Sequence, residues 1–229
     1  MESLGKAAVA EFIATFALVF IGAGAILVSG GDLLGIAMAF GLVLAIMISV
    51  TAHISGGIVN PAVAIGLWVT GKLDTQRTVV YIVAELLGAI AGAFLLKLIV
   101  PTEIFDAGNG GATLVNAQIT GFGVGKAVLL EAVLTFFLVF AVFGTAVDDR
   151  GPFGKTAGLT IGLVLTFDIL AGGPLTGASM NPARSLGPAL ASGNWTDWWV
   201  YWVGPIAGGI IAAVVYWGVF LRGKEPATP

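Results

Sequence analysis

The sequence contains the tripeptide Asn-Pro-Ala twice, as Asn60-Pro61-Ala62 and as Asn181-Pro182-Ala183. Each copy lies inside a strongly apolar stretch and follows a short lead-in with glycine, Ser55-Gly56 before the first and Thr176-Gly177 before the second. Asn is a good helix cap, and Pro suits the first turn of a helix, where its missing N–H costs nothing. Each tripeptide therefore predicts the start of a short helix.

The repetition extends upstream of the two tripeptides. Residues 11–20 read EFIATFALVF and residues 131–140 read EAVLTFFLVF, an offset of 120, and the tripeptides themselves are 121 residues apart. Neither half has a long polar linker or a break in composition. We infer a single domain, 1–229, built of two repeats that span about 1–115 and 116–229.

The composition places the chain in a membrane. Hydrophobic residues make up 58% and charged residues only 10%, with a mean hydropathy of +1.01, whereas about a quarter of the residues of an average soluble protein are charged. A net charge of −3 gives no reason to expect nucleic acid as a partner. The absence of cysteine excludes disulfides, thiolate metal sites and cysteine catalysis. We expect no cofactor, no metal and contact with lipid.

Six stretches are long enough to cross a bilayer, which takes about 20 apolar residues. The predicted spans are 7–28, 33–52, 78–100, 126–147, 155–172 and 198–221. The tripeptide segments between spans two and three and between spans five and six are too apolar for loops and too short to cross. Each predicts a half-helix of about ten residues, roughly 15 Å long. The predicted fold is an all-α membrane protein with six transmembrane helices and two re-entrant half-helices.

The basic residues of the short loops predict the orientation. With a cytoplasmic N-terminus, most of them fall inside: Lys6, Lys72, Arg77, Arg150, Lys155, Arg222 and Lys224. We therefore expect a multi-pass protein of the cell membrane with both termini cytoplasmic. Three spans per half invert the second half relative to the first, so the half-helices meet near the midplane. Irregular backbone at that depth must be buried or line a wet cavity, so the lead-ins 53–59 and 173–180 predict the walls of a pathway.

The doubled Asn-Pro-Ala box, the following Arg184-Ser185 and the inverted three-plus-three repeat resemble the aquaporin (major intrinsic protein) family. The resemblance covers essentially the whole chain. It implies a homotetrameric channel for water and small neutral solutes, with a constriction formed here by Phe40, Ile169, Ala178 and Arg184. Water-selective members carry His at the position of Ile169, and a constriction without His is similar to that of archaeal-type aquaporins. The departure predicts slow passage of solutes such as glycerol.

Physical chemistry supports a pore that excludes protons. A helix carries about half a positive charge at its N-terminus, and two such ends facing one point repel cations. Pores of the aquaporin type exclude protons and cations in this way. The amides of Asn60 and Asn181 can each donate to one water oxygen, which interrupts a proton relay at that point.

Several polar residues inside the apolar segments allow two interpretations. Glu11 and Glu131 can relay protons or accept hydrogen bonds from the re-entrant loops, and the repeat favours loop support. For His53 we favour a packed, hydrogen-bonded role in the first loop over gating. Glu85 fits a lipid-interface or loop contact. Asp168 can face the outer vestibule or bond to a neighbouring helix.

Three functional classes compete for this pattern. A passive pore needs the two half-helices and no titratable pair beside them. A secondary transporter also has inverted repeats, but this chain has Ile58-Val59 and Ser179-Met180 next to its boxes. An intramembrane enzyme would need a nucleophile with a base or a metal set, and a chain with one His and no Cys argues against it. Ser185 and Tyr201-Trp202 favour a water pore over a glycerol facilitator, which in the family usually has Asp and Pro-Leu at these positions.

Overall fold

The computed structural model describes residues 2–150 and 156–223, and within these ranges every regular element is a helix. Six of the helices are long and apolar enough to cross a membrane, which confirms the predicted fold class. They are α1 (Leu4–Val28), α2 (Leu33–Thr51), α4 (Thr75–Ile99), α6 (Val124–Val142), α7 (Ala157–Thr176) and α9 (Val200–Tyr216). The π-helical segments η2 (Phe143–Val147) and η4 (Trp217–Leu221) extend α6 and α9.

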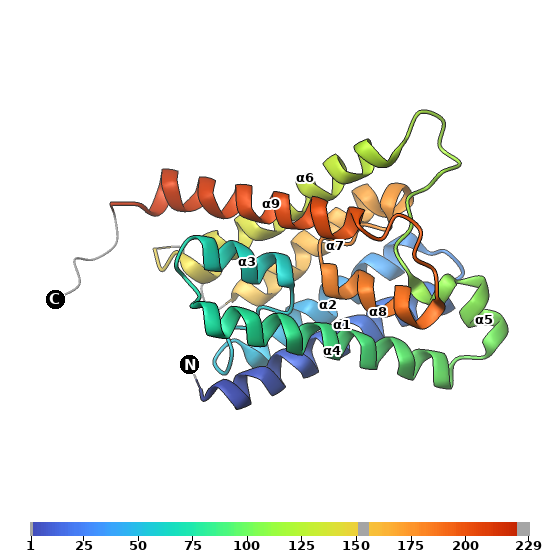
Figure 1. Cartoon of the computed structure of the whole chain (residues 1–229), viewed down its shortest axis with the longest axis horizontal. Helices are drawn as coiled ribbons and strands as arrows, with labels where there is room; N and C mark the ends of the chain where they lie inside the picture. Colours follow the sequence, from blue (N-terminus) through green and yellow to red (C-terminus); the bar gives the residue numbers. More distant parts are fainter. Residues whose placement is uncertain (1, 151–155, 224–229) are drawn as a thin grey trace.

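The two tripeptides begin two short helices, α3 (Pro61–Val69) and α8 (Pro182–Ser192). Figure 1 shows α3 and α8 on opposite sides of the middle of the molecule along its long axis, as an inverted repeat requires. Each half-helix packs mainly on a span from the other half, α3 on α9 and α8 on α4. The two halves therefore interlock through their half-helices. The connection α5 (Thr102–Ala107) and the 3₁₀ turn η1 (Asn109–Gly111) lie before the second half.

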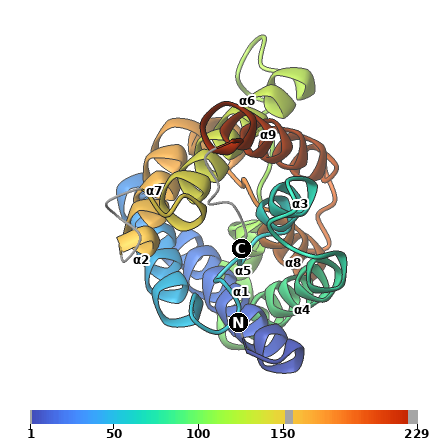
Figure 2. The same ribbon diagram turned by 90° about the vertical axis from the view of Figure 1, so that its left-hand side faces the viewer.

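The spans pair in the same way within each half. Helix α1 packs along α4, α6 packs along α9, and α2 meets α7 between the halves; the view along the bundle shows these pairs side by side (Figure 2). Glycines permit the close approach. A Cβ at Gly88 would lie 2.3 Å from the Phe12 carbonyl oxygen, and one at Gly208 would lie 2.0 Å from that of Ala132. Gly88 and Gly208 are 120 residues apart, and so are Phe12 and Ala132, so the same contact occurs in both halves.

The lead-in of the second half-helix is shorter than predicted. Helix α7 continues through Pro174 to Thr176 and ends at Gly177, which adopts a left-handed conformation with φ of 79°. Asn116 caps this end, since its side-chain amide donates to the Pro174 carbonyl (3.0 Å) and its backbone N–H donates to Leu175 (2.9 Å). The prediction of an irregular segment from residue 173 was therefore wrong, because Asn116, in the loop before α6, supplies partners that keep the last turn helical.

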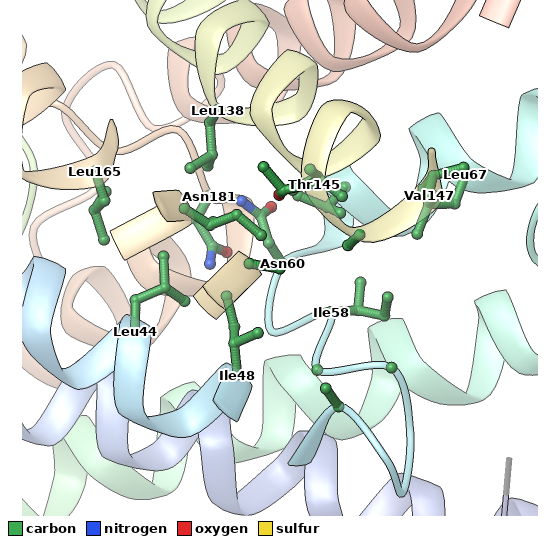
Figure 3. Close-up of a pocket in the computed structure, with 18 of the residues that line it drawn as sticks. Leu44, Ile48, Ile58, Asn60, Leu67, Leu138, Thr145, Val147, Leu165 and Asn181 are labelled. Carbon is green, nitrogen blue, oxygen red and sulfur yellow. The ribbon is translucent and has the colours of Figure 1, made fainter. Parts of the chain in front are cut away.

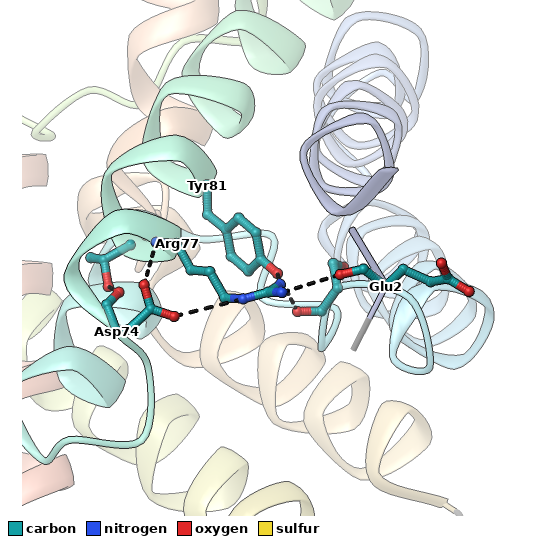
Figure 4. Close-up of polar contacts among 6 residues, drawn as sticks. Glu2, Asp74, Arg77 and Tyr81 are labelled. Atoms are coloured by element: carbon teal, nitrogen blue, oxygen red, sulfur yellow. Dashed lines mark hydrogen bonds and ion pairs between the residues drawn. The ribbon is translucent and has the colours of Figure 1, made fainter. Parts of the chain in front are cut away.

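Basic side chains tie the chain together at the end where α1 begins and α9 ends. Arg77 donates to the carbonyl of Glu2 (3.1 Å) and to the hydroxyl of Tyr81 (2.9 Å), as Figure 4 shows. Arg150 donates to the carbonyl of Phe220 (2.9 Å) at the end of η4. Of the basic residues used for the orientation, Lys155 and Lys224 lie outside the described residues.

Candidate functional site: a pore at the meeting of two half-helices

Both tripeptides fold as their residue types predict. The side-chain oxygen of Asn60 accepts from the N–H of Ala62 (2.9 Å), and that of Asn181 accepts from the N–H groups of Ala183 (3.0 Å) and Arg184 (3.2 Å). The prolines occupy the first turns of α3 and α8. Both Asn side chains thus cap a helix N-terminus and are fixed in orientation by their own helix.

The same two Asn side chains also join the halves. The amide nitrogen of Asn60 donates to the Met180 carbonyl, and that of Asn181 donates to the Val59 carbonyl, each at 2.8 Å. An amide NH₂ carries two hydrogens, so each Asn keeps one hydrogen for the pore. The sequence did not predict this reciprocal bridge, because the acceptors are backbone carbonyls.

The bridging carbonyls belong to residues with unusual backbone geometry. Val59 has φ of 58° and Met180 has φ of 54°. A positive φ is costly for a residue with a Cβ, most of all for a β-branched one, and such strain gathers at functional sites. In both loops this left-handed residue directly precedes the capping Asn. The conformation turns its carbonyl toward the opposite half.

Two buried carboxylates hold the loops from behind. Glu11 on α1 accepts from the N–H groups of Ile58 (2.9 Å) and Val59 (2.6 Å). Glu131 on α6 accepts from Ser179 (3.0 Å) and Met180 (2.8 Å). Neither carboxylate lines the cavity described below. This geometry matches the interpretation in which Glu11 and Glu131 accept hydrogen bonds from the re-entrant loops.

Glu85 adds a third carboxylate that has no counterpart in the second half. Its Oε1 accepts from the N–H of Asn60 at 2.9 Å, and the residue is fully buried. A lipid-interface position is therefore excluded, and the loop contact is the correct alternative. Pro205 stands 120 residues later. An acidic residue within a span was the available signal, but without a repeat partner its target was not predictable.

The second half uses hydroxyl groups where the first uses Glu85. The Ser179 hydroxyl donates to the Asn181 carbonyl (2.9 Å) and bonds to the hydroxyl of Ser185, which in turn bonds to that of Thr113 (2.7 Å). This chain of three hydroxyls links the loop between η1 and α6 to the second tripeptide. Thr113 lies far from both boxes in sequence, so its role was missed.

A cavity of about 660 Å³ runs past both tripeptides. Asn60 and Asn181 lie in its wall, and Figure 3 shows their amides together among aliphatic side chains such as Leu44 and Leu138. The lining also includes the charged residues Lys72 and Asp149, together with Phe40, Ala178 and Arg184. The wall is thus largely apolar with a polar centre, which offers a small permeant few partners except at the tripeptides.

Three of the four predicted constriction residues line the cavity. Arg184 donates through Nη1 to the Gly111 carbonyl (3.0 Å), and its guanidinium carbon lies 4.7 Å from the centre of the Phe40 ring. Its Nη2 is buried and has no hydrogen-bond partner among the described residues. Ile169 is buried but does not line the cavity, and Leu165, one turn earlier on α7, lines it instead.

Two of the polar residues differ from their predicted settings. His53 lies in the turn after α2 with its side chain exposed, away from the buried part of the loop, and it bonds to no residue that the structure describes. Loop support by His53 is therefore wrong. Asp168 is only 1% exposed, and its oxygens have no partner among the described residues. Asp168 is thus buried away from a vestibule and bonds to no helix that the structure describes.

Comparison with known proteins identifies the family. The model of the family "Major intrinsic protein" matches residues 1–216. Aquaporin TIP4-4 of Zea mays is 46% identical over 96% of this chain and 90% of its own length, and aquaporin TIP2-1 of Arabidopsis thaliana is 40% identical over 96% and 89%. The solved structure of the aquaglyceroporin from Plasmodium falciparum superposes with a TM-score of 0.83 at 28% identity, covering 96% of this chain and 98% of that one. With its two capped half-helices meeting in one cavity, this chain belongs to the major intrinsic protein family.

Proposed function

We propose that this protein is a passive channel that conducts water across a membrane, excludes protons and ions, and passes small uncharged solutes such as glycerol slowly. It is a channel and not an enzyme, as its family membership implies. The observation that carries the proposal is the reciprocal bridge of Asn60 and Asn181. The bridge holds two helix N-termini and two free amide hydrogens in one cavity.

This arrangement explains how water passes and protons do not. A water between the two amides accepts from both, so its lone pairs are occupied and it cannot accept a proton from the next water in the file. The two N-terminal helix ends add a positive field at the same point. The carboxylates of Glu11 and Glu131 accept from loop N–H groups behind the pore. They therefore do not supply the titratable group in the path that a coupled transporter would require.

Selectivity belongs to the end of the cavity near Arg184. Phe40, Ala178 and Arg184 form the constriction in this proposal, with Ile169 behind them at the position where water-selective relatives carry His. The small Ala178 and the missing imidazole leave a wider, less polar opening. Each hydrogen bond that a permeant exchanges here is worth about 1 kcal/mol net, so the loss of one donor lowers discrimination against glycerol without abolishing it.

A glycerol facilitator is the second candidate, because the solved structure cited above is that of an aquaglyceroporin. Ser185 and Tyr201 argue against it, since both are engaged in bonds that hold the second loop. Ser185 belongs to the hydroxyl chain, and the Tyr201 hydroxyl donates to the Thr176 carbonyl at 2.8 Å. Pro at position 201 would lose the bond to Thr176, and this bond supports the water pore over the facilitator.

Stopped-flow light scattering on proteoliposomes separates the candidates. With an impermeant osmolyte we expect fast shrinkage, and with glycerol a much slower reswelling. Glycerol flux as fast as water flux would indicate the facilitator, and no acceleration over empty liposomes would exclude a water channel. A pH-sensitive dye trapped in the same vesicles reports on protons, and an imposed proton gradient that collapses quickly would contradict proton exclusion.

Placement of Ala178 in the pathway is tested with mercury. The chain has no cysteine, so mercuric chloride should leave the water flux of the parent unchanged. Ala178→Cys places a thiolate, a soft metal ligand, in the cavity wall, and mercury should then block the flux. A variant that conducts normally and stays unblocked would show that residue 178 does not face the pathway.

Orientation, membrane and assembly complete the proposal. Both termini are cytoplasmic in this proposal, supported by Lys6, Lys72 and Arg77 at the end of the bundle where α1 begins, and the proposed membrane is the cell membrane. The homotetramer rests on the resemblance to the family. Chemical cross-linking in native membranes checks the assembly, and a ladder that stops at the monomer would contradict it.

A further inference from the structure

A glycine on α1 faces the ring of Phe40. Gly22 is buried, and a Cβ added to it would lie 2.1 Å from Cε1, 2.4 Å from Cδ1 and 2.5 Å from Cζ of that ring. Carbon atoms pack at about 3.5–4.0 Å. The ring therefore occupies the space that any side chain at position 22 would need.

The ring lies between this glycine and the pathway. On one side it contacts the α1 backbone at Gly22, and on another the guanidinium of Arg184 lies 4.7 Å from the ring centre. Arg184 is itself tied to the Gly111 carbonyl. Because Phe40 also lines the cavity, a ring displaced from α1 has the cavity as its open side.

The corresponding positions of the second half carry a different pair. The residue 120 after Gly22 is Val142, and the residue 121 after Phe40 is Ile161; both line the cavity. In the first half, a residue without a side chain is paired with a large ring. In the second half, both residues have aliphatic side chains of middle size. Packing of the repeated helices does not in itself demand glycine here. Among ordinary residues glycine is the least favourable in a helix interior, so its presence needs a local reason.

We propose that Gly22 is a positioning residue for the constriction: its missing side chain forms the recess that keeps the Phe40 ring out of the pathway. The size of this recess then sets the opening beside Arg184 and the discrimination between water and larger neutral solutes. The inference rests on the proposed function in so far as Phe40 belongs to the constriction. The position of the ring itself does not depend on what permeates.

Gly22→Ala is the direct test. Its methyl group must push the ring toward Arg184, and overpacking of this kind raises the barrier enough for water permeability to fall about tenfold. Glycerol permeability should fall by a larger factor, because glycerol is the larger permeant, so the ratio of glycerol to water flux decreases. Gly24→Ala is the matched control on the same helix. Its Cβ would meet only a terminal methyl of Leu96 at 3.2 Å, and its fluxes should equal those of the parent.

A double variant separates this role from a general folding defect. Phe40→Leu removes the ring atoms that conflict with a methyl group at position 22, so Gly22→Ala/Phe40→Leu should conduct water within about twofold of Phe40→Leu alone, a strong coupling between neighbouring sites. If Gly22→Ala does not fold, recovery of a monodisperse protein in the double variant supports the same conflict. A double variant as slow or as unstable as Gly22→Ala would overturn the proposal.

A structure of Gly22→Ala by electron cryomicroscopy gives a readout that is independent of flux. We expect the Phe40 ring to have moved away from α1 and closer to Arg184. An unmoved ring, or a Gly22→Ala channel with the water and glycerol fluxes of the parent, would refute the role of Gly22. If the parent conducts no water, the proposed function is refuted instead. The displacement of the Phe40 ring then decides the role of Gly22.

Discussion

The two halves of the molecule hold the same loop with different chemistry. In the first half, Glu11 and Glu85 supply two carboxylates for the N–H groups that lead to Asn60. In the second half, Glu131 is the single carboxylate, and hydroxyl groups take the place of the other. The Asn that caps the half-helix, and its bridge to the opposite half, are the same in both. The comparison shows that the bridge is the fixed feature and that its support can change.

The largest expected effect follows from the single carboxylate of the second half. Glu131→Leu leaves the N–H groups of Ser179 and Met180 and the hydroxyl of Thr176 without their acceptor. Buried donors without partners cost about 1–3 kcal/mol each, so three of them predict a loss of at least about 3 kcal/mol. The melting temperature in detergent, followed by size-exclusion chromatography, measures it.

The first half should tolerate the matching change better. Glu11→Leu orphans two N–H groups, and Glu85 still holds the N–H of Asn60. Its melting temperature should therefore lie between those of Glu131→Leu and the parent. Glu103→Leu, at an exposed position of α5, is the control and should not differ from the parent. Equal losses for Glu11 and Glu131 would mean that the two supports are equivalent.

The next prediction concerns the bridge that both halves share. Asn60→Asp and Asn181→Asp keep a side chain that caps a helix well but remove the amide donor and place a carboxylate in the cavity. Both variants should conduct water more slowly by a similar factor and leak cations, because a negative charge attracts them. Proteoliposome flux and a membrane-potential dye measure the two effects. A variant that stays tight to cations while its counterpart leaks would show that the two amides are not equivalent.

Much of this site is predictable from the sequence because its motif occurs in both repeats. The Asn-Pro pair carries its own cap and first turn, and Glu11 and Glu131 stand at one repeat position, so the half-helices and the residues beside them were predictable. Glu85 and Thr113 reach the loops only through tertiary packing, and neither has a repeat partner. His53 misled for the converse reason, since a single polar residue near a motif says nothing of which way the turn directs it.

Arg184 marks the strongest difference in charge between the half-helices. The residue 121 earlier is Val63, which also lines the cavity. Arg184→Val thus gives the second half-helix the side chain of the first and removes a fixed positive charge beside Phe40. We expect proton or cation leak to appear while water still flows. Vesicles with a trapped pH indicator measure it, and an unchanged leak in a folded variant would show that the helix ends alone exclude cations.

The smallest expected effect concerns a contact of the second half, where Asp148 follows η2. Its carboxylate accepts from Arg150 and from the hydroxyl of Tyr216 (3.1 Å), and the residue 120 earlier is Val28, so the first half has no such contact. The hydrogen bonds from the Arg150 guanidinium hold the pKa of Asp148 well below its usual value. A depressed carboxyl pKa stabilises the fold above the pKa of the unfolded chain, and the contribution is lost as the pH falls below about 4.

Asp148→Asn should therefore lower the melting temperature at pH 7 by only about 1–2 °C, because Arg150 is partly exposed and water screens the pair. Below about pH 4 the difference between variant and parent should shrink, since the unfolded parent then binds the proton that the folded parent refuses. Asp149→Asn is the neighbouring control, and it should follow the parent at every pH. A difference that stays constant from pH 7 to pH 3 would show that Asp148 acts through shape alone. In that case the extra contact of the second half would be a matter of packing between η2 and η4 and not of charge.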